Sequence, residues 1–241
     1  MEEILEKTIG QIVADDHRSA AVFEKFGIDF CCNGNRGIDE ACEQKNVDAA
    51  ELRKKLEIAI AETTADTTDY KSWPLDLLAD HIEKKHHRYV EERIPVLKQY
   101  LNKINKVHGA KHPELQQIYD LFVASGGELA MHMKKEELVL FPYIRKMVKA
   151  KQNGETLDAP RFGTVKNPIQ TMMNEHDNEG ERFRQIEALS DSYTPPEDAC
   201  GTYKVAFAML KEFQDDLHLH IHLENNILFP KAEELESELN V

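Results

Sequence analysis

Two stretches of the chain repeat one pattern of residues that commonly bind metals. His132 is followed four residues later by Glu136, and His220 is followed in the same way by Glu224. After three further residues, both copies end in Leu-Phe-Pro. Because an α-helix has about 3.6 residues per turn, a His and a Glu four positions apart point to the same face. That face is otherwise apolar in both segments, so both pairs are predicted to point into a helical core.

A second, weaker pattern repeats with nearly the same offset. His87 and His176 are each followed by Glu-Arg and an apolar residue, and these two His lie 89 residues apart, against 88 residues for the first pattern. Two patterns that share one offset indicate a duplicated helical hairpin, and two hairpins predict an up-down four-helix bundle. Turn-forming residues lie midway along each hairpin, where the chain must reverse: Gly109, Pro113, Pro195, Pro196 and Gly201. Segment 151–167 is expected to join the two hairpins.

The four His and the two Glu are expected to meet in one layer of this bundle. Six polar groups in an apolar core cost several kcal/mol unless they are satisfied, and cations can satisfy them. A single tetrahedral zinc ion needs only four ligands, whereas six ligands with two carboxylates able to bridge favour two metal ions. Mixed nitrogen and oxygen donors suit iron or manganese. With a bridging oxygen, each octahedral metal keeps one position free for O₂, NO or water.

The remaining His residues are assigned outside this layer. His86 neighbours His87, but the alignment of the two repeats selects His87. His108 lies about 31 Å beyond His87 on a continuous helix, at 1.5 Å per residue. It is therefore expected at the tip of the hairpin and is excluded from the site. The others are expected to be ordinary surface residues: His17, His81, His112, His218 and His222.

Acidic residues also lie near the expected ligands in the sequence. Glu128 and Asp216 each lie four residues before a ligand His, which is again a match between the repeats. They are expected to hydrogen-bond ligand imidazoles or to line a path for protons or ions, with a solvated helix face as the equal alternative. Glu137 aligns with Asn225, so Glu136 is the better ligand.

Composition and charge exclude several classes of function for this 241-residue chain. Hydrophobic residues make up 41%, which is enough for a core and excludes wholesale disorder. The net charge of −14 disfavours nucleic acid as a partner, and no apolar run approaches the roughly 20 residues of a membrane span. The acidic N-terminus lacks the layout of a signal peptide, and the four Cys show no disulfide framework. A cytoplasmic protein is therefore predicted.

The chain is predicted to divide into two units. Residues 1–62 form a small helical domain with a Gly-rich loop that carries Cys31 and Cys32, residues 63–71 form a polar linker, and residues 72–241 form the bundle. Adjacent Cys rarely form a mutual disulfide without strain. The pair is interpreted as thiols that receive NO, contact a metal in transit or dock a partner, with a buried turn as the alternative. Cys42 and Cys200 are expected to be ordinary thiols.

On these motifs the chain resembles a known family. Residues 72–241 resemble a hemerythrin-like di-iron domain. Cys31-Cys32-Asn33-Gly34, preceded by Phe26-Gly27-Ile28-Asp29-Phe30, resembles the short N-terminal domain of the Repair of Iron Centres family. This resemblance implies an all-α fold and two iron ions, bridged by an oxo group and by both Glu. The implied iron ligands are His87, His132, Glu136, His176, His220 and Glu224. Glu175 resembles a family position near the metal channel.

The resemblance also implies a function. Members of the family are implicated in restoring iron–sulfur clusters damaged by NO or peroxide, by donating iron from a labile di-iron centre or by handling NO directly. The implied partners are damaged iron–sulfur proteins or NO-handling proteins, together with NO and O₂. The alternative is a hemerythrin-like protein that binds or senses O₂ or NO without repairing clusters. Oxygen carriers have a fifth His at the site and this chain offers four, which favours repair. Pairing into a homodimer is a further expectation.

Overall fold

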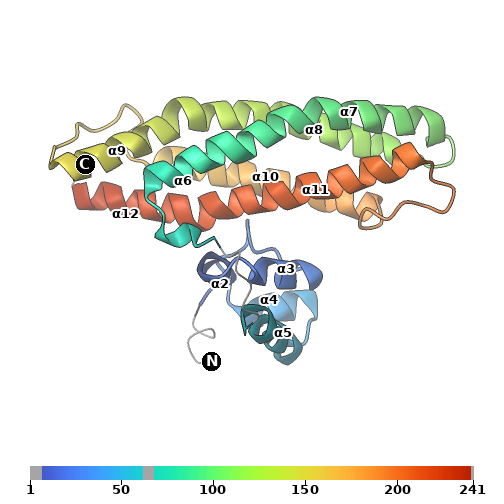
Figure 1. Cartoon of the computed structure of the whole chain (residues 1–241), viewed down its shortest axis with the longest axis horizontal. Helices are drawn as coiled ribbons and strands as arrows, with labels where there is room; N and C mark the ends of the chain where they lie inside the picture. The colour runs from blue at the N-terminus through green and yellow to red at the C-terminus, as the bar shows by residue number, and fades with distance from the viewer. Residues whose placement is uncertain (1–6, 62–67, 240–241) are drawn as a thin grey trace.

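The computed structural model describes residues 7–61 and 68–239, which form an all-α protein (Figure 1). No strand occurs in these residues, where the single β-bridge joins Thr8 to Gly37. Residues 75–239 form four long helical rods. The rods lie side by side, and a small helical unit sits against the middle of one side (Figure 1). The predicted bundle is therefore confirmed. Within the described part of the chain, no helix is both long and apolar enough to cross a membrane.

Three of the four rods are helices joined end to end through a wide, π-helical turn. The first rod runs through α6 (Leu75–His81), η2 (Ile82–His87) and α7 (Arg88–His108). The second runs through α8 (Glu114–Lys135), η3 (Glu136–Leu140) and α9 (Phe141–Asn153). The third is α10 (Lys166–Leu189), and the fourth runs through α11 (Gly201–Leu223), η4 (Glu224–Leu228) and α12 (Phe229–Leu239). The chain reverses over 109–113 and 190–200, where the Gly and Pro signals lie.

Two apolar clusters hold the rods together, one on either side of the predicted ligand layer. The first joins α7, α8, α10 and α11 to the small unit and includes Leu97, Phe122 and Phe183. The second joins α6, α9 and α12 to the start of α10 and includes Phe141 and Phe229. Each such side chain contributes about 1.5–3 kcal/mol when fully buried. The layer between the clusters can therefore be polar without loss of the fold.

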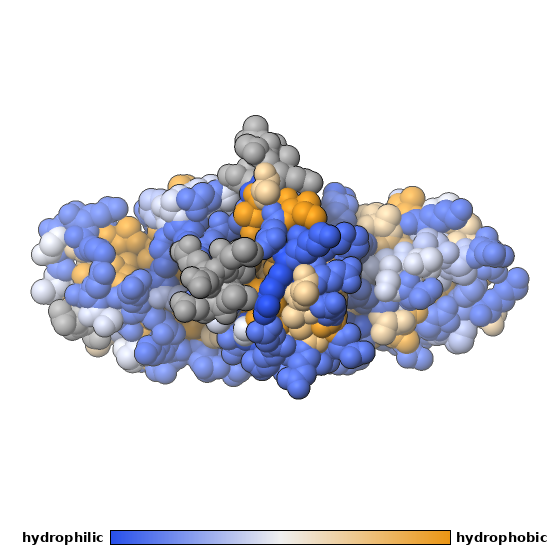
Figure 2. All heavy atoms as spheres, turned by 90° about the horizontal axis from the view of Figure 1, so that it is seen from below, coloured by the Kyte–Doolittle hydropathy of each residue, from blue (hydrophilic) through white to orange (hydrophobic). Residues whose placement is uncertain are grey.

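Within residues 7–61, the small unit contains four helices, and it lies over the middle of the bundle. They are α2 (Ile9–Asp15), α3 (Ser19–Lys25), α4 (Ile38–Lys45) and α5 (Ala49–Ala61). Figure 2 looks onto this side, where hydrophilic residues cover most of the face and apolar residues gather near its middle. Most of the predicted linker, 63–71, lies outside the described residues. Its last two residues begin a short 3₁₀ turn, η1 (Tyr70–Ser72).

Candidate metal centre

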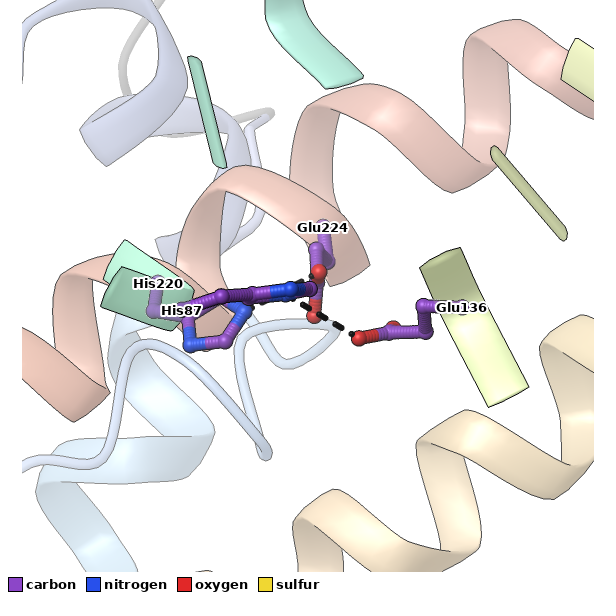
Figure 3. A group of neighbouring side chains, drawn as sticks. All are labelled: His87, Glu136, His220 and Glu224. Carbon is purple, nitrogen blue, oxygen red and sulfur yellow. Dashed lines mark hydrogen bonds and ion pairs between the residues drawn. The ribbon is translucent and has the colours of Figure 1, made fainter. Parts of the chain in front are cut away.

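The six predicted ligands meet in one layer inside the bundle, and all four rods contribute to it. Each of the six residues is at most 3% exposed. Their ligand atoms fall into two overlapping groups that share Glu136 and Glu224. His87 and His220 complete one group (Figure 3), and His132 and His176 complete the other. The six ligand residues are His87, His132, Glu136, His176, His220 and Glu224.

The two carboxylates lie between the two pairs of imidazoles. Glu224 directs Oε1 to His220 Nε2 and Oε2 to His176 Nε2, both at 3.1 Å. Glu136 Oε2 lies 3.4 Å from the Nε2 atoms of both His87 and His132. Each carboxylate therefore contacts one imidazole from each group. This is the arrangement that two bridging carboxylates require.

Several of these buried atoms have the ion-pair contacts given above at most and form no well-aligned hydrogen bond. They are His87 Nε2, both carboxylate oxygens of Glu136, and Glu224 Oε2. A buried polar atom without a partner costs roughly 1–3 kcal/mol, and such atoms are rare in native proteins. Two cations with nitrogen and oxygen ligands would satisfy all of them, so the donor set fits a dinuclear metal centre.

The wide turns of the rods place the ligands at this height. His87 ends η2, Glu136 begins η3, and Glu224 begins η4. Such π-helical turns occur frequently at functional sites. Pro142 and Pro230 are the second residues after the ends of η3 and η4, and they have no backbone N–H to donate to the preceding turn. The repeated Leu-Phe-Pro therefore has a physical role, because it favours a wide turn immediately after each Glu.

Polar side chains from neighbouring rods hold three of the four imidazoles in orientation. His87 Nδ1 lies 3.0 Å from Glu137 Oε1, and His132 Nδ1 lies 2.8 Å from Glu175 Oε2. His176 Nδ1 lies 2.8 Å from Asn225 Oδ1. A partner on Nδ1 fixes the ring so that Nε2 faces the metal. The sequence pointed to the Glu175 position, whereas the roles of Glu137 and Asn225 were missed.

The other acidic residues expected to support the ligands lie farther out. Asp216 Oδ1 is 3.0 Å from His86 Nδ1, and the His86 ring stacks on His220 with ring centroids 5.6 Å apart. Asp216 therefore acts on a His outside the predicted ligand set. Glu128 forms an ion pair with Arg182 at 2.9 Å and is not hydrogen-bonded to a ligand imidazole.

The expectation that His222 lies at the surface is wrong. His222 is only 1% exposed, because the small unit covers this side of α11. The ring lies against Phe30 with centroids 5.7 Å apart, and Asn226 Nδ2 lies 3.1 Å from His222 Nδ1. Burial lowers the pKa of His222 to about 3. His222 is thus a neutral ring within the contact between the two units.

Opposite charges within the layer stabilise one another. Burial is the largest influence on His132 and opposes a charged ring, but Glu136 and other nearby acids outweigh it and raise its pKa to about 10. Burial also opposes the charge of Glu136 and Glu224, yet the imidazoles lower the pKa of both carboxyls. A cation that binds here therefore displaces protons.

A cavity of about 170 Å³ leads to one side of the layer. His132 and His176 line its inner end, and Glu128, Glu175 and Glu179 contribute carboxylates to its wall. Glu179 is 3% exposed and accepts a hydrogen bond from Ser125 Oγ at 2.7 Å. Burial raises its pKa. Sequence reasoning missed this residue because Glu179 has no counterpart in the repeat.

The Cys loop of the small unit contacts the ligand layer directly. Asn225, whose Oδ1 lies against His176, uses its Nδ2 to donate a hydrogen bond to the Cys31 carbonyl at 3.2 Å. Cys32 Sγ lies 3.5 Å from the His176 carbonyl oxygen. His108 lies at the end of α7, where its Nε2 is 3.2 Å from Cys200 Sγ. The structure therefore places Cys31 and Cys32 beside the candidate centre, and His108 away from it.

Comparison with known families assigns both parts of the chain. Residues 5–60 match the model ScdA_N, a domain of unknown function (DUF542). Residues 78–232 match the hemerythrin HHE cation-binding domain. The second match covers more than half of the chain.

Relatives resemble the chain over nearly its full length. The iron–sulfur cluster repair protein YtfE of Musicola paradisiaca is 33% identical over 230 residues, which cover 94% of this chain and 96% of the relative. The iron–sulfur cluster repair protein ScdA of Staphylococcus haemolyticus is 31% identical, with 94% and 97% covered. A probable iron–sulfur cluster repair protein of Haemophilus influenzae is 32% identical, with 88% and 89% covered.

Proposed function

This chain belongs to the family of iron–sulfur cluster repair proteins that carry a hemerythrin HHE domain, and from that premise we propose how it acts in repair. The six converging side chains hold two iron ions, and the protein supplies iron from this centre to damaged clusters. The two carboxylates shared between the groups support this proposal above all other observations. Iron bound there supplies exchangeable metal and open coordination positions for NO.

The protein's own residues make the centre both selective and labile. Four imidazoles and two carboxylates suit iron, whereas softer ions such as Cu(I) prefer thiolates. Glu137, Glu175 and Asn225 orient the rings. Because His132 holds a proton strongly in the metal-free state, protons compete with the metal and limit how tightly it binds. A donor of iron needs such limited affinity.

The remaining expectations fit this role. The partners that we propose are damaged iron–sulfur proteins, with NO as a small ligand that reaches the layer along the cavity beside His132 and His176. We place the protein in the cytoplasm, which suits its four free Cys. The two proposed units are 1–62, with Cys31 and Cys32 at the contact, and 72–241.

Iron transfer from the full chain tests the proposal. Iron-loaded protein is mixed anaerobically with an apo iron–sulfur protein and sulfide, and cluster formation is followed by absorbance. Glu136→Ala and Glu224→Ala are expected to lose both irons and the transfer, whereas His108→Ala is expected to retain them. Iron that resists a weak Fe(II) chelator and binds O₂ reversibly would instead favour the hemerythrin-like carrier.

A further inference from the structure

A second group of potential metal ligands lies outside the dinuclear layer, in the Cys loop. One ligand atom from each of Asp29, Cys31 and Cys32 lies within 4.8 Å of the others. Both Cys are free thiols. We propose that these three side chains form a separate binding site for one divalent transition-metal cation of the Fe²⁺ or Zn²⁺ type. The inference rests on this loop and does not depend on iron donation by the dinuclear centre.

The spacing of the donor atoms already suits a bound ion. Cys31 Sγ and Cys32 Sγ lie 3.7 Å apart, and Cys31 Sγ lies 3.3 Å from Asp29 Oδ1. Two thiolates that bind a tetrahedral ion at about 2.3 Å are about 3.8 Å apart, and a thiolate and a carboxylate oxygen are about 3.5 Å apart. The loop therefore needs only small adjustments to close around a cation.

The loop is built to hold two adjacent thiols on one side. Side chains of successive residues point to opposite sides in extended backbone. Here Asp29 Oδ1 accepts the backbone N–H groups of Cys31 at 3.1 Å and Cys32 at 3.0 Å, which turns the chain tightly. Asn33 Nδ2 donates to Asp29 Oδ2 at 2.8 Å. The carboxylate that shapes the turn thus also faces both sulfurs.

Charge and space around the loop favour a cation with thiolate ligands. Two thiolates and one carboxylate carry three negative charges, so a divalent ion leaves one, and Arg184 Nη1 lies 3.0 Å from Asp29 Oδ2 to balance it. A cavity of about 330 Å³ reaches Asp29 and Cys31 from the side of α10 and α11. Gly180 lines it, and a Cβ there would lie 3.0 Å from Cys32 Sγ. Thiolate donors select borderline and soft cations such as Zn²⁺ and iron.

Cobalt(II) titration of the full metal-free chain under anaerobic conditions tests the site. Thiolate ligands give Co²⁺ an intense sulfur-to-metal charge-transfer band, which the nitrogen and oxygen ligands of the dinuclear layer cannot give. We expect one thiolate-bound Co²⁺ per chain. The band should disappear in Cys31→Ser and in Cys32→Ser. It should persist in Cys42→Ser, which removes a buried thiol elsewhere in the small unit.

Two further measurements separate ligation from folding. Asp29→Asn keeps the oxygen that accepts the two N–H groups but removes the charge, and we expect the affinity of the thiolate-bound Co²⁺ to fall about 10-fold or more. Equilibrium dialysis with Zn²⁺ should give one fewer ion per chain in Cys31→Ser than in the unaltered chain. Absence of the band from the unaltered chain, its persistence in both Ser variants, or an unchanged affinity in Asp29→Asn would overturn the three-ligand site.

Discussion

Metal binding by the half of the dinuclear layer that contains His132 is expected to depend steeply on pH. In the metal-free protein, burial opposes a charged His132 ring, but Glu136 and Glu175 outweigh it and raise the pKa to about 10. The ring is therefore protonated at pH 7 and must lose this proton before Nε2 binds a metal. One pKa unit corresponds to about 1.4 kcal/mol, so displacing the proton at pH 7 costs about 4 kcal/mol. The affinity should rise about tenfold for each pH unit up to about pH 10.

Competition for Co²⁺ between the metal-free Cys31→Ser chain, which lacks the proposed thiolate site, and a chelator of known affinity measures this dependence. Binding constants are taken at several pH values from slightly acidic to alkaline and are corrected for protonation of the chelator. Proton release on binding is recorded with an indicator dye. The hydrogen bond to Glu175 is one cause of the raised pKa, so in Glu175→Gln the affinity should stop rising at a lower pH and be higher at pH 7. A corrected affinity that does not change with pH, or binding without proton release, would refute the reasoning.

Three further predictions test the surroundings of the layer. Asn225→Ala removes the partner of a ligand imidazole and should weaken metal binding about 10- to 100-fold. Asn226 contacts the Cys loop but no predicted ligand, so Asn226→Ala should leave the metal affinity unchanged. Equal losses of affinity in the two variants, measured by competition with a chelator, would contradict this. A hydrogen bond from His108 lowers the pKa of exposed Cys200 to about 7, so iodoacetamide should alkylate Cys200 rapidly at neutral pH and several-fold more slowly in His108→Ala. Phe183 is fully buried, so Phe183→Ala should lower the free energy of unfolding by about 3–5 kcal/mol, and an unchanged denaturation midpoint would show that the cluster is not essential.

The contacts that orient the imidazoles show where reasoning from the sequence stopped. Glu175 lies on α10 and contacts His132 on α8, and Glu137 lies in η3 and contacts His87 on the first rod. Such contacts depend on how far each rod is rotated and shifted relative to its neighbours, which local periodicity does not specify. The repeat alignment did pair Glu137 with Asn225, and both positions prove to support a predicted ligand. Comparing them only as candidate ligands concealed this shared role.

The sequence by itself determined the bundle and the composition of its central layer. A His and a Glu four residues apart share a helix face because of the helical period, and a duplicated hairpin must bring its copies to the same height. Only the tertiary structure showed that the small unit buries His222 and brings Cys31 and Cys32 against the layer. Only the tertiary structure, too, showed that Glu179 lines the cavity beside His132 and His176. Helical periodicity is a property of neighbouring residues, whereas these contacts join segments far apart in the chain and exist only once the two units have packed together.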